Sequence, residues 1–224
     1  MALTKPQKKV ISSGSRFRVL VTGRRFGKTF LAINELAKFA SKPNQRVWYV
    51  APTYRQAKAI CWNVLKEKMI YHKWVKNINH SDLTITLKNN STITLRGSDN
   101  EQSLRGVGLN FLCIDEFADV NQEAWYEVLR PTLSDTKGHA LFCGSPRGFG
   151  NWSYELFKQG ETNKDWASFK YTTIEGGNVD QDEVEQAKQD LDIRTFQQEY
   201  EATFVNYSGM IYYNFNRQSN IIEK

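Results

Sequence analysis

The sequence has little cysteine and little proline, with three and five residues among 224. Cys61, Cys113 and Cys143 are odd in number, far apart and surrounded by apolar or aromatic neighbours. A disulfide framework or a zinc site needs paired or closely spaced cysteines, so neither is expected. The pattern predicts buried, reduced thiols, as in a cytosolic protein.

Long apolar runs, repeats and low-complexity linkers are also missing. No stretch approaches the roughly 20 apolar residues that span a bilayer, so an integral membrane protein is not expected. The charged N-terminal residues are not followed by an apolar run, which argues against a secretory signal. The 40% hydrophobic and 13% aromatic content argues against disorder. The length suits one large domain, or a domain with a small appendage.

Acidic residues are scarce in the first half of the chain, and basic residues are outnumbered by acidic ones in the second half. Residues 1–110 carry 20 Lys and Arg against 5 Asp and Glu, whereas residues 111–224 carry 10 against 19. A basic half favours a polyanionic partner, either nucleic acid or nucleotide phosphates. Solvated faces of surface helices are the alternative interpretation.

Apolar segments alternate between strand and helix patterns along the chain. Strands are predicted at 17–22, 46–51, 110–115, 139–143 and 166–173. A hairpin is predicted over 83–95 around Asn89-Asn90, since Asn tolerates the positive φ of a two-residue turn. Helices are predicted at 28–40, 54–70, 121–130 (interrupted by Pro131), 151–159 and 181–202 (interrupted near Asp192). This alternation predicts an α/β fold with a mainly parallel, doubly wound sheet, to which the hairpin is an antiparallel addition.

The first predicted strand runs into a glycine-containing turn, Thr22-Gly23-Arg24-Arg25-Phe26-Gly27-Lys28-Thr29. A strand, a tight loop and a helix start bring several N–H groups to one point, which is an arrangement that binds phosphate. Lys28 would reach the β- and γ-phosphates, and the Thr29 hydroxyl would bind Mg²⁺. Thr22 stands where this motif normally has its first glycine, and we expect Gly23 to supply the flexibility instead.

Two carboxylates end the apolar segment Phe111–Ile114. In a parallel sheet the carboxyl end of this strand lies at the same edge as the phosphate-binding turn. Asp115 would hold Mg²⁺, directly or through water, and Glu116 would polarise the attacking water as general base. The pattern of loop and acidic pair together predicts nucleotide hydrolysis.

A cation near the γ-phosphate accelerates phosphoryl transfer, and three arginines are candidates. Arg24 and Arg25 lie in the loop itself, whereas Arg105 lies on a glycine-flanked segment that can project towards a neighbouring subunit. Each has a surface salt bridge or a DNA contact as its alternative role. Ser145 follows the strand at 139–143, where it can sense the γ-phosphate or simply form a turn.

Together these segments resemble the ATPase domain of the large terminase subunit of tailed bacteriophages, the motor that packages DNA into a prohead. GRRFGKT resembles the deviant phosphate loop of that family, with its early arginine at Arg24. FLCIDE resembles the Walker B segment with the catalytic glutamate, and VWYVAPTYRQAK is similar to a segment shared with helicase-like ATPases. The resemblance covers almost the whole chain and implies a P-loop NTPase fold of the RecA/ASCE-like class.

Further roles follow only from this resemblance. LFCGSPRG resembles the coupling motif, carried here by Gly144, Ser145 and Pro146, and SLRG favours Arg105 as a trans-acting finger. Gln7 stands where the family has an adenine-reading glutamine. The resemblance implies ATP and Mg²⁺ as cofactors, and double-stranded DNA, portal protein and small terminase subunit as partners. It also implies a homo-oligomeric ring, a pentamer on the prohead, in the cytoplasm of an infected bacterium.

The resemblance further divides the chain into an ATPase domain, 1–205, and a C-terminal tail or linker, 206–224. Large terminases continue into a nuclease domain for which this chain has no room, so DNA cleavage is not expected. Two other functions remain open at this point. A helicase-type ATPase normally carries two RecA-like domains, and a non-catalytic nucleic-acid-binding module would use the loop only to grip backbone phosphate.

Overall fold

The computed structural model describes residues 2–206, and within this range the strands form one eight-stranded sheet of order β3-β4-β5-β2-β6-β7-β1-β8. The strands are β1 (Phe17–Thr22), β2 (Arg46–Ala51), β3 (Val75–Asn79), β4 (Thr84–Leu87), β5 (Thr92–Gly97), β6 (Phe111–Asp115), β7 (His139–Gly144) and β8 (Trp166–Tyr171). The ladder from β5 to β8 is parallel throughout, while β3 and β4 pair antiparallel at one edge. The predicted α/β class and the mainly parallel sheet are confirmed.

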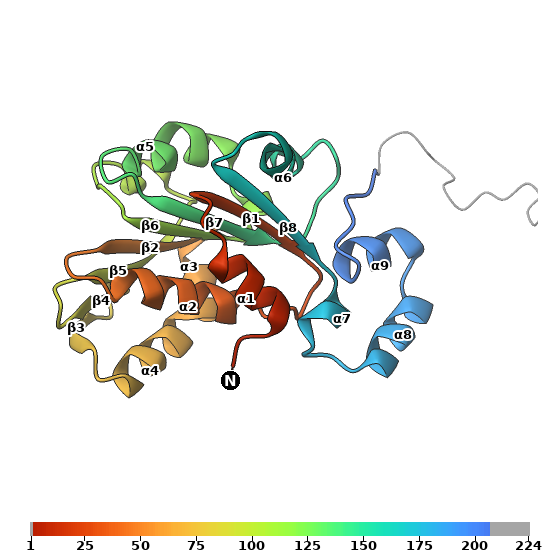
Figure 1. The fold of residues 1–224 in the computed structure, drawn as a ribbon, viewed down its shortest axis with the longest axis horizontal. Helices are drawn as coiled ribbons and strands as arrows, with labels where there is room; N and C mark the ends of the chain where they lie inside the picture. Colours follow the sequence, from red (N-terminus) through yellow and green to blue (C-terminus); the bar gives the residue numbers. More distant parts are fainter. Residues whose placement is uncertain (1, 207–224) are drawn as a thin grey trace, which may run out of the picture.

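Helices cover both faces of this sheet. They are α1 (Lys5–Ser12), α2 (Lys28–Ala40), α3 (Tyr54–Ala57), α4 (Asn63–Tyr71), α5 (Arg130–Thr132), α6 (Trp152–Thr162), α7 (Thr173–Gly176), α8 (Gln181–Asp190) and α9 (Ile193–Glu199). Figure 1 shows α1, α2 and α4 on one face, α5 and α6 on the other, and α7 to α9 beyond the β8 edge. The short helical turns are η1 (Lys58–Trp62), η2 (Glu101–Leu104), η3 (Phe117–Asp119) and η4 (Ala124–Leu129).

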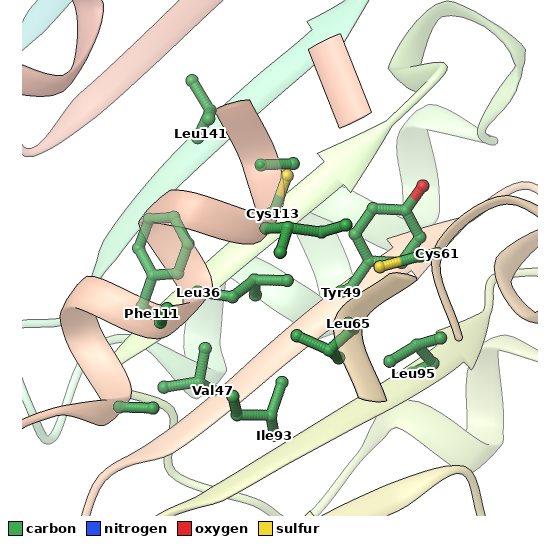
Figure 2. Close-up of a cluster of buried hydrophobic side chains, with 14 of the residues drawn as sticks. Leu36, Val47, Tyr49, Cys61, Leu65, Ile93, Leu95, Phe111, Cys113 and Leu141 are labelled. Carbon is green, nitrogen blue, oxygen red and sulfur yellow. The ribbon is translucent and has the colours of Figure 1, made fainter. Parts of the chain in front are cut away.

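Two apolar layers hold the sheet between the helices. Along β2, Val47 and Tyr49 pack into one layer, whereas Trp48 and Val50 pack into the other. Successive strand side chains point to opposite faces, so a strand buried on both faces is apolar throughout. Figure 2 shows the layer beneath α2, where the Tyr49 ring lies beside Cys61 and Cys113. All three cysteines are buried free thiols, as predicted.

Most predicted elements begin and end close to the predicted residues. β1, α2 and β2 match residue for residue, and the helix predicted at 54–70 runs from 54 to 71 through the π-helical turn η1. The break near Asp192 is also found, because this residue caps α9 by accepting hydrogen bonds from the N–H groups of Arg194 and Thr195.

Three local predictions differ from the structure. The hairpin connection spans residues 88–91 rather than a two-residue turn, although Asn90 does have a positive φ of 64°. β3 was not predicted, because Val75–Asn79 is a half-exposed edge strand without a continuous apolar face. Pro131 does not end its helix: it lies in the first turn of α5, where an N–H donor is not required.

Of the predicted tail or linker, 206–224, residues 207–224 lie outside the described residues. Within residues 2–206, no helix combines the length and the apolar character needed to cross a membrane.

Candidate functional site

Three parallel strands bring their carboxyl ends to one edge of the sheet, and the candidate residues gather there. β1 leads into the phosphate loop, β6 ends at Asp115, and β7 ends just before Ser145. A cavity of about 550 Å³ opens at this edge. Its walls include the predicted site residues Gln7, Arg24, Arg25, Gly27, Lys28, Thr29, Asp115, Glu116 and Ser145.

The phosphate loop, residues 23–27, meets α2 at Gly27. This residue has a φ of 93°, which favours glycine, and its carbonyl accepts the first hydrogen bond of the helix from Leu31 N. The N-terminus of α2 therefore faces the cavity, with Lys28 and Thr29 in its first turn. A helix start of this kind attracts anions through its free N–H groups and its dipole.

At Gly23 the structure shows a steric requirement for glycine. Its φ is not positive; the positive φ values of the loop lie at Gly27 and at Arg25, whose φ is 63°. A Cβ at position 23 would instead lie 2.4 Å from Thr173 Oγ1 and 2.5 Å from the Tyr200 carbonyl oxygen. Glycine is needed there because the C-terminal segment packs directly on the loop backbone.

Asp115 is fixed from three sides at the end of β6. Its Oδ1 accepts hydrogen bonds from Glu116 N (3.1 Å) and Cys143 Sγ (3.3 Å), and its Oδ2 accepts one from Tyr49 Oη (2.5 Å). The residue is only 2% exposed. Burial, together with the Asp115 charge, raises the pKa of Tyr49 well above its ordinary value, so the phenol remains a donor.

Glu116 lies beside Lys28, with 3.6 Å between Oε1 and Nζ. Its backbone has a left-handed conformation, φ 47° and ψ 44°, that is uncommon for a non-glycine residue and often marks functional positions. Burial raises the pKa of Glu116, while the Lys28 ammonium opposes this rise. Lys28 Nζ also lies 3.4 Å from Ser145 Oγ, so three predicted residues are within reach of one another.

The donor set fits Mg²⁺ bound together with phosphate. Asp115 and Thr29 line the same cavity and offer hard oxygen ligands. Within residues 2–206 no three His, Cys, Asp or Glu side chains cluster as a complete metal cage. Mg²⁺ commonly takes one or two protein oxygens and completes its coordination with phosphates and water, so these two residues suit it.

Arg24 is held by Glu199, a residue that sequence reasoning missed. The distance from Arg24 Nε to Glu199 Oε2 is 2.5 Å, and Arg24 N donates to the Glu199 carbonyl (2.7 Å). Arg147 forms two hydrogen bonds to Asp119 (3.0 and 2.8 Å) and lies 3.9 Å from Glu199. All four residues line the cavity. Arg24 was predicted from the loop motif; of the other three, Arg147 has a sequence signal in its position two residues after Ser145.

Gln7 lies in the cavity wall, but its amide is engaged within the protein. Nε2 donates to the carbonyls of Phe26 (3.2 Å) and Gly27 (3.3 Å), and Oε1 accepts from Thr4 N (3.0 Å). Asn178, a second cavity residue missed from the sequence, also donates to the Phe26 carbonyl. Gln7 thus supports the phosphate loop in this structure.

The remaining predicted residues lie away from the cavity. Arg105 is exposed in a separate hollow of about 300 Å³, beside Glu127 and Asp135. It does not reach the cavity of its own chain, so a role in hydrolysis requires a neighbouring subunit. Gly144 and Pro146 are buried on either side of Ser145, and a Cβ at Gly144 would come within 3.2 Å of the Phe117 ring.

The parallel sheet, the phosphate loop at the end of β1 and the acidic end of β6 define the phosphate-loop class of α/β proteins. More narrowly, the chain belongs to the family of terminase large subunits of the T4likevirus type, whose N-terminal part matches residues 19–219. The expected family is confirmed.

Relatives support this assignment. The terminase large subunit of Escherichia phage T5 is 34% identical over 206 residues, covering 90% of this chain and 47% of that protein. The large terminase ATPase domain of Thermus phage P74-26 is 25% identical, with a TM-score of 0.80 over 91% of this chain and 94% of that one. The large terminase of bacteriophage HK97 shares the fold, with a TM-score of 0.77 at 16% identity over 91% of this chain and 51% of that one. The chain spans about half the length of the curated relatives it matches.

Proposed function

We propose that this chain is a Mg²⁺-dependent ATPase that drives the packaging of double-stranded viral DNA into a prohead. The observation that carries this proposal is the meeting of Lys28, Asp115 and Glu116 at one cavity. The family assignment and the likeness to an ATPase domain of Thermus phage P74-26 support it.

The residues have complementary roles in this hydrolysis. Lys28 and the start of α2 bind the β- and γ-phosphates, and Thr29 and Asp115 would hold Mg²⁺, which neutralises charge that develops on the phosphate oxygens. Glu116 accepts a proton from the attacking water, and its raised pKa suits a general base. Ser145, at 3.4 Å from Lys28 Nζ, is placed to sense the γ-phosphate.

The arginines would supply the remaining positive charge. Arg24 lines the cavity and can act in cis, whereas Arg105 can act only on the cavity of a second copy. On this proposal the protein works in a homo-oligomeric ring, formed on a portal in a prohead with the small terminase subunit as a further partner. The bacterial cytoplasm is the compartment in which such packaging takes place. Gln7 would lie next to the adenine.

The helicase-type alternative loses support, because the family assignment covers most of the chain and names a terminase. The non-catalytic alternative does not account for a strained, partly buried glutamate next to the phosphate-loop lysine.

The test is ATP turnover by the 224-residue chain over a range of protein concentrations, with and without double-stranded DNA. Glu116→Gln should lower turnover about 10²- to 10⁴-fold, the usual contribution of a general base, while the affinity for ATPγS stays unchanged. Glu185→Gln, an exposed change on α8, is the matched control. Near-normal turnover in Glu116→Gln would contradict the assigned role.

Arg105→Ala addresses the ring. It should remove the part of the turnover that rises with protein concentration and leave the concentration-independent part in place. If Arg105→Ala has no effect and Arg24→Ala removes the turnover, the catalytic arginine acts in cis.

A further inference from the structure

The carbonyl groups of the phosphate loop are bonded one after another by side chains from outside the loop. Thr173 Oγ1 donates to the Arg24 carbonyl (2.8 Å), and Asn178 Nδ2 donates to those of Arg25 (3.2 Å) and Phe26 (3.0 Å). Gln7 Nε2 adds hydrogen bonds to the carbonyls of Phe26 and Gly27. Every carbonyl from residue 24 to residue 27 is thereby engaged.

These bonds also fix the direction of the loop N–H groups. Within residues 2–206 every peptide bond is trans, so the C=O of one residue and the N–H of the next point in opposite directions. Holding the carbonyls of residues 24–27 on one side therefore directs the N–H groups of residues 25–28 to the other. Within residues 2–206, the N–H groups of residues 25–28 make no hydrogen bond to other protein groups, so they are free to bind an anion.

Two glycines let the segment 173–178 approach the loop this closely. A Cβ on Gly176 would lie 2.7 Å from Phe26 Cα, so only glycine allows this contact. Gly177 then turns the chain with a φ of 69°, and Asn178 follows with its amide over the loop. Asn178 is exposed at the cavity wall, whereas Thr173 is buried, 1% exposed, and does not line the cavity.

We propose that Asn178 and Thr173 are positioning residues that, together with Gln7, form a clasp on the phosphate-loop carbonyls and so aim the loop N–H groups at a bound polyphosphate. The inference rests on the proposed nucleotide site and assigns a role to the segment after β8, which carries no recognisable motif. Because the clasp acts on the loop, its effect is the same for any ligand that carries the phosphates, whatever its base.

Binding of a ligand without a base provides the test. Asn178→Ala, Asn178→Asp and Thr173→Val should each weaken the binding of inorganic tripolyphosphate and of ADP by the same factor, about tenfold, when both are measured calorimetrically in EDTA. The preference for ATP over GTP should not change. Asn63→Asp makes the same charge change at an exposed position of α4 and should leave all of these affinities unchanged.

A second readout does not depend on ligand binding. Hydrogen exchange in the free protein should accelerate in all three variants at the two loop amides that are hydrogen-bonded, Gly23 N to the Tyr171 carbonyl and Arg24 N to the Glu199 carbonyl, with the melting temperature of the Asn178 variants unchanged. Unchanged exchange in the loop would overturn the clasp. So would intact tripolyphosphate binding with a lost ATP preference in the Asn178 variants, which would make Asn178 a base-reading residue. If the wild-type chain binds neither tripolyphosphate nor ADP, the proposed function fails instead, and the exchange rates still decide on the clasp.

Discussion

Lys28, Asp115, Glu116 and Ser145 form one wall of the cavity, here called the sheet wall, whereas Gln7, Arg24, Asn178 and Glu199 form the other, the end wall. The sheet wall grows out of strand ends and the first turn of α2. Its spacing is set by the parallel ladder, in which Asp115 lies opposite Cys143. The backbone at these strand ends is therefore positioned by main-chain hydrogen bonds, and the Asp115 side chain is held in addition by Tyr49 and Cys143.

The end wall is assembled from the two ends of the described chain. Residue 7 and residues 178 and 199 meet at the phosphate loop through side-chain hydrogen bonds and ion pairs. Arg24 is largely exposed, with 67% of its side chain accessible, so its ion pair can exchange with water or with an anion. The sheet wall is thus held mainly by the backbone of the sheet, whereas the end wall holds the phosphate loop through side chains that can adjust.

Gly23→Ala has the largest expected effect on the unfolding free energy. It tests whether the contact between the phosphate loop and the C-terminal segment can adjust. The new Cβ would lie 2.5 Å from the Tyr200 carbonyl oxygen and 2.7 Å from Thr173 N, and backbone atoms cannot turn aside. Overpacking of this kind costs about 1–3 kcal/mol of unfolding free energy. Urea denaturation measures it, with Gly14→Ala as control, since nothing lies within 4 Å of that position. An unchanged midpoint would mean that the contact with the C-terminal segment is loose.

Tyr49→Phe probes the sheet wall from beneath, with an expected effect no larger than that of Gly23→Ala. It removes the donor to Asp115 Oδ2 and leaves a buried carboxylate oxygen without that partner, which costs about 1–3 kcal/mol. We expect the Mg²⁺ concentration needed for half-maximal ATPγS binding to rise about tenfold, because Asp115 is held less firmly. Tyr54→Phe is the control, since its hydroxyl donates to the Ser81 carbonyl near the hairpin, away from Asp115. An unchanged Mg²⁺ requirement would show that the main chain alone positions Asp115.

The two walls also differ in how far the sequence predicts them. Asp115 and Glu116 were predicted because an apolar strand ending in acids, placed after a phosphate-loop motif, constrains both the element and its edge. Because the carboxyl ends of parallel strands lie at one edge of the sheet, the acids and the loop are brought together there. In the end wall, Arg24 was predicted from the loop and Gln7 from the resemblance, but Asn178 and Glu199 belong to no such pattern. They reach the loop because α7 to α9 lie beyond the β8 edge (Figure 1).

Local steric detail escaped prediction for a related reason. Gly23 fits the motif by its type, but the need for it comes from a contact with Tyr200, 177 residues later in the chain.

The uneven charge of the two halves is partly explained by the cavity. Arg24, Arg25 and Lys28 come from the basic half, and Asp115, Glu116, Asp119 and Glu199 come from the acidic half.

Glu199→Gln has the smallest expected effect. It tests the end wall most directly, because it removes the ion pair between Arg24 and Glu199. The pair is partly exposed, so we expect a loss of at most about 1 kcal/mol of unfolding free energy at pH 7 and low salt, shrinking as salt is added. Glu161→Gln, which breaks an exposed pair with Lys158 on α6, is the matched control.

The pH dependence of this difference has a defined sign. Burial alone would raise the pKa of Glu199, but the hydrogen bond and charge of Arg24 hold it below its usual value. A carboxylate with a depressed folded-state pKa stabilises the protein fully above the ordinary glutamate pKa, roughly 4.3, and loses this contribution as the pH falls further. The stability gap between wild type and Glu199→Gln should therefore be constant from pH 8 to about 5.5 and close below about pH 4. A gap that persists in acid would mean that Glu199 acts by packing against the loop and not by its charge, and the end wall would then be as fixed as the sheet wall.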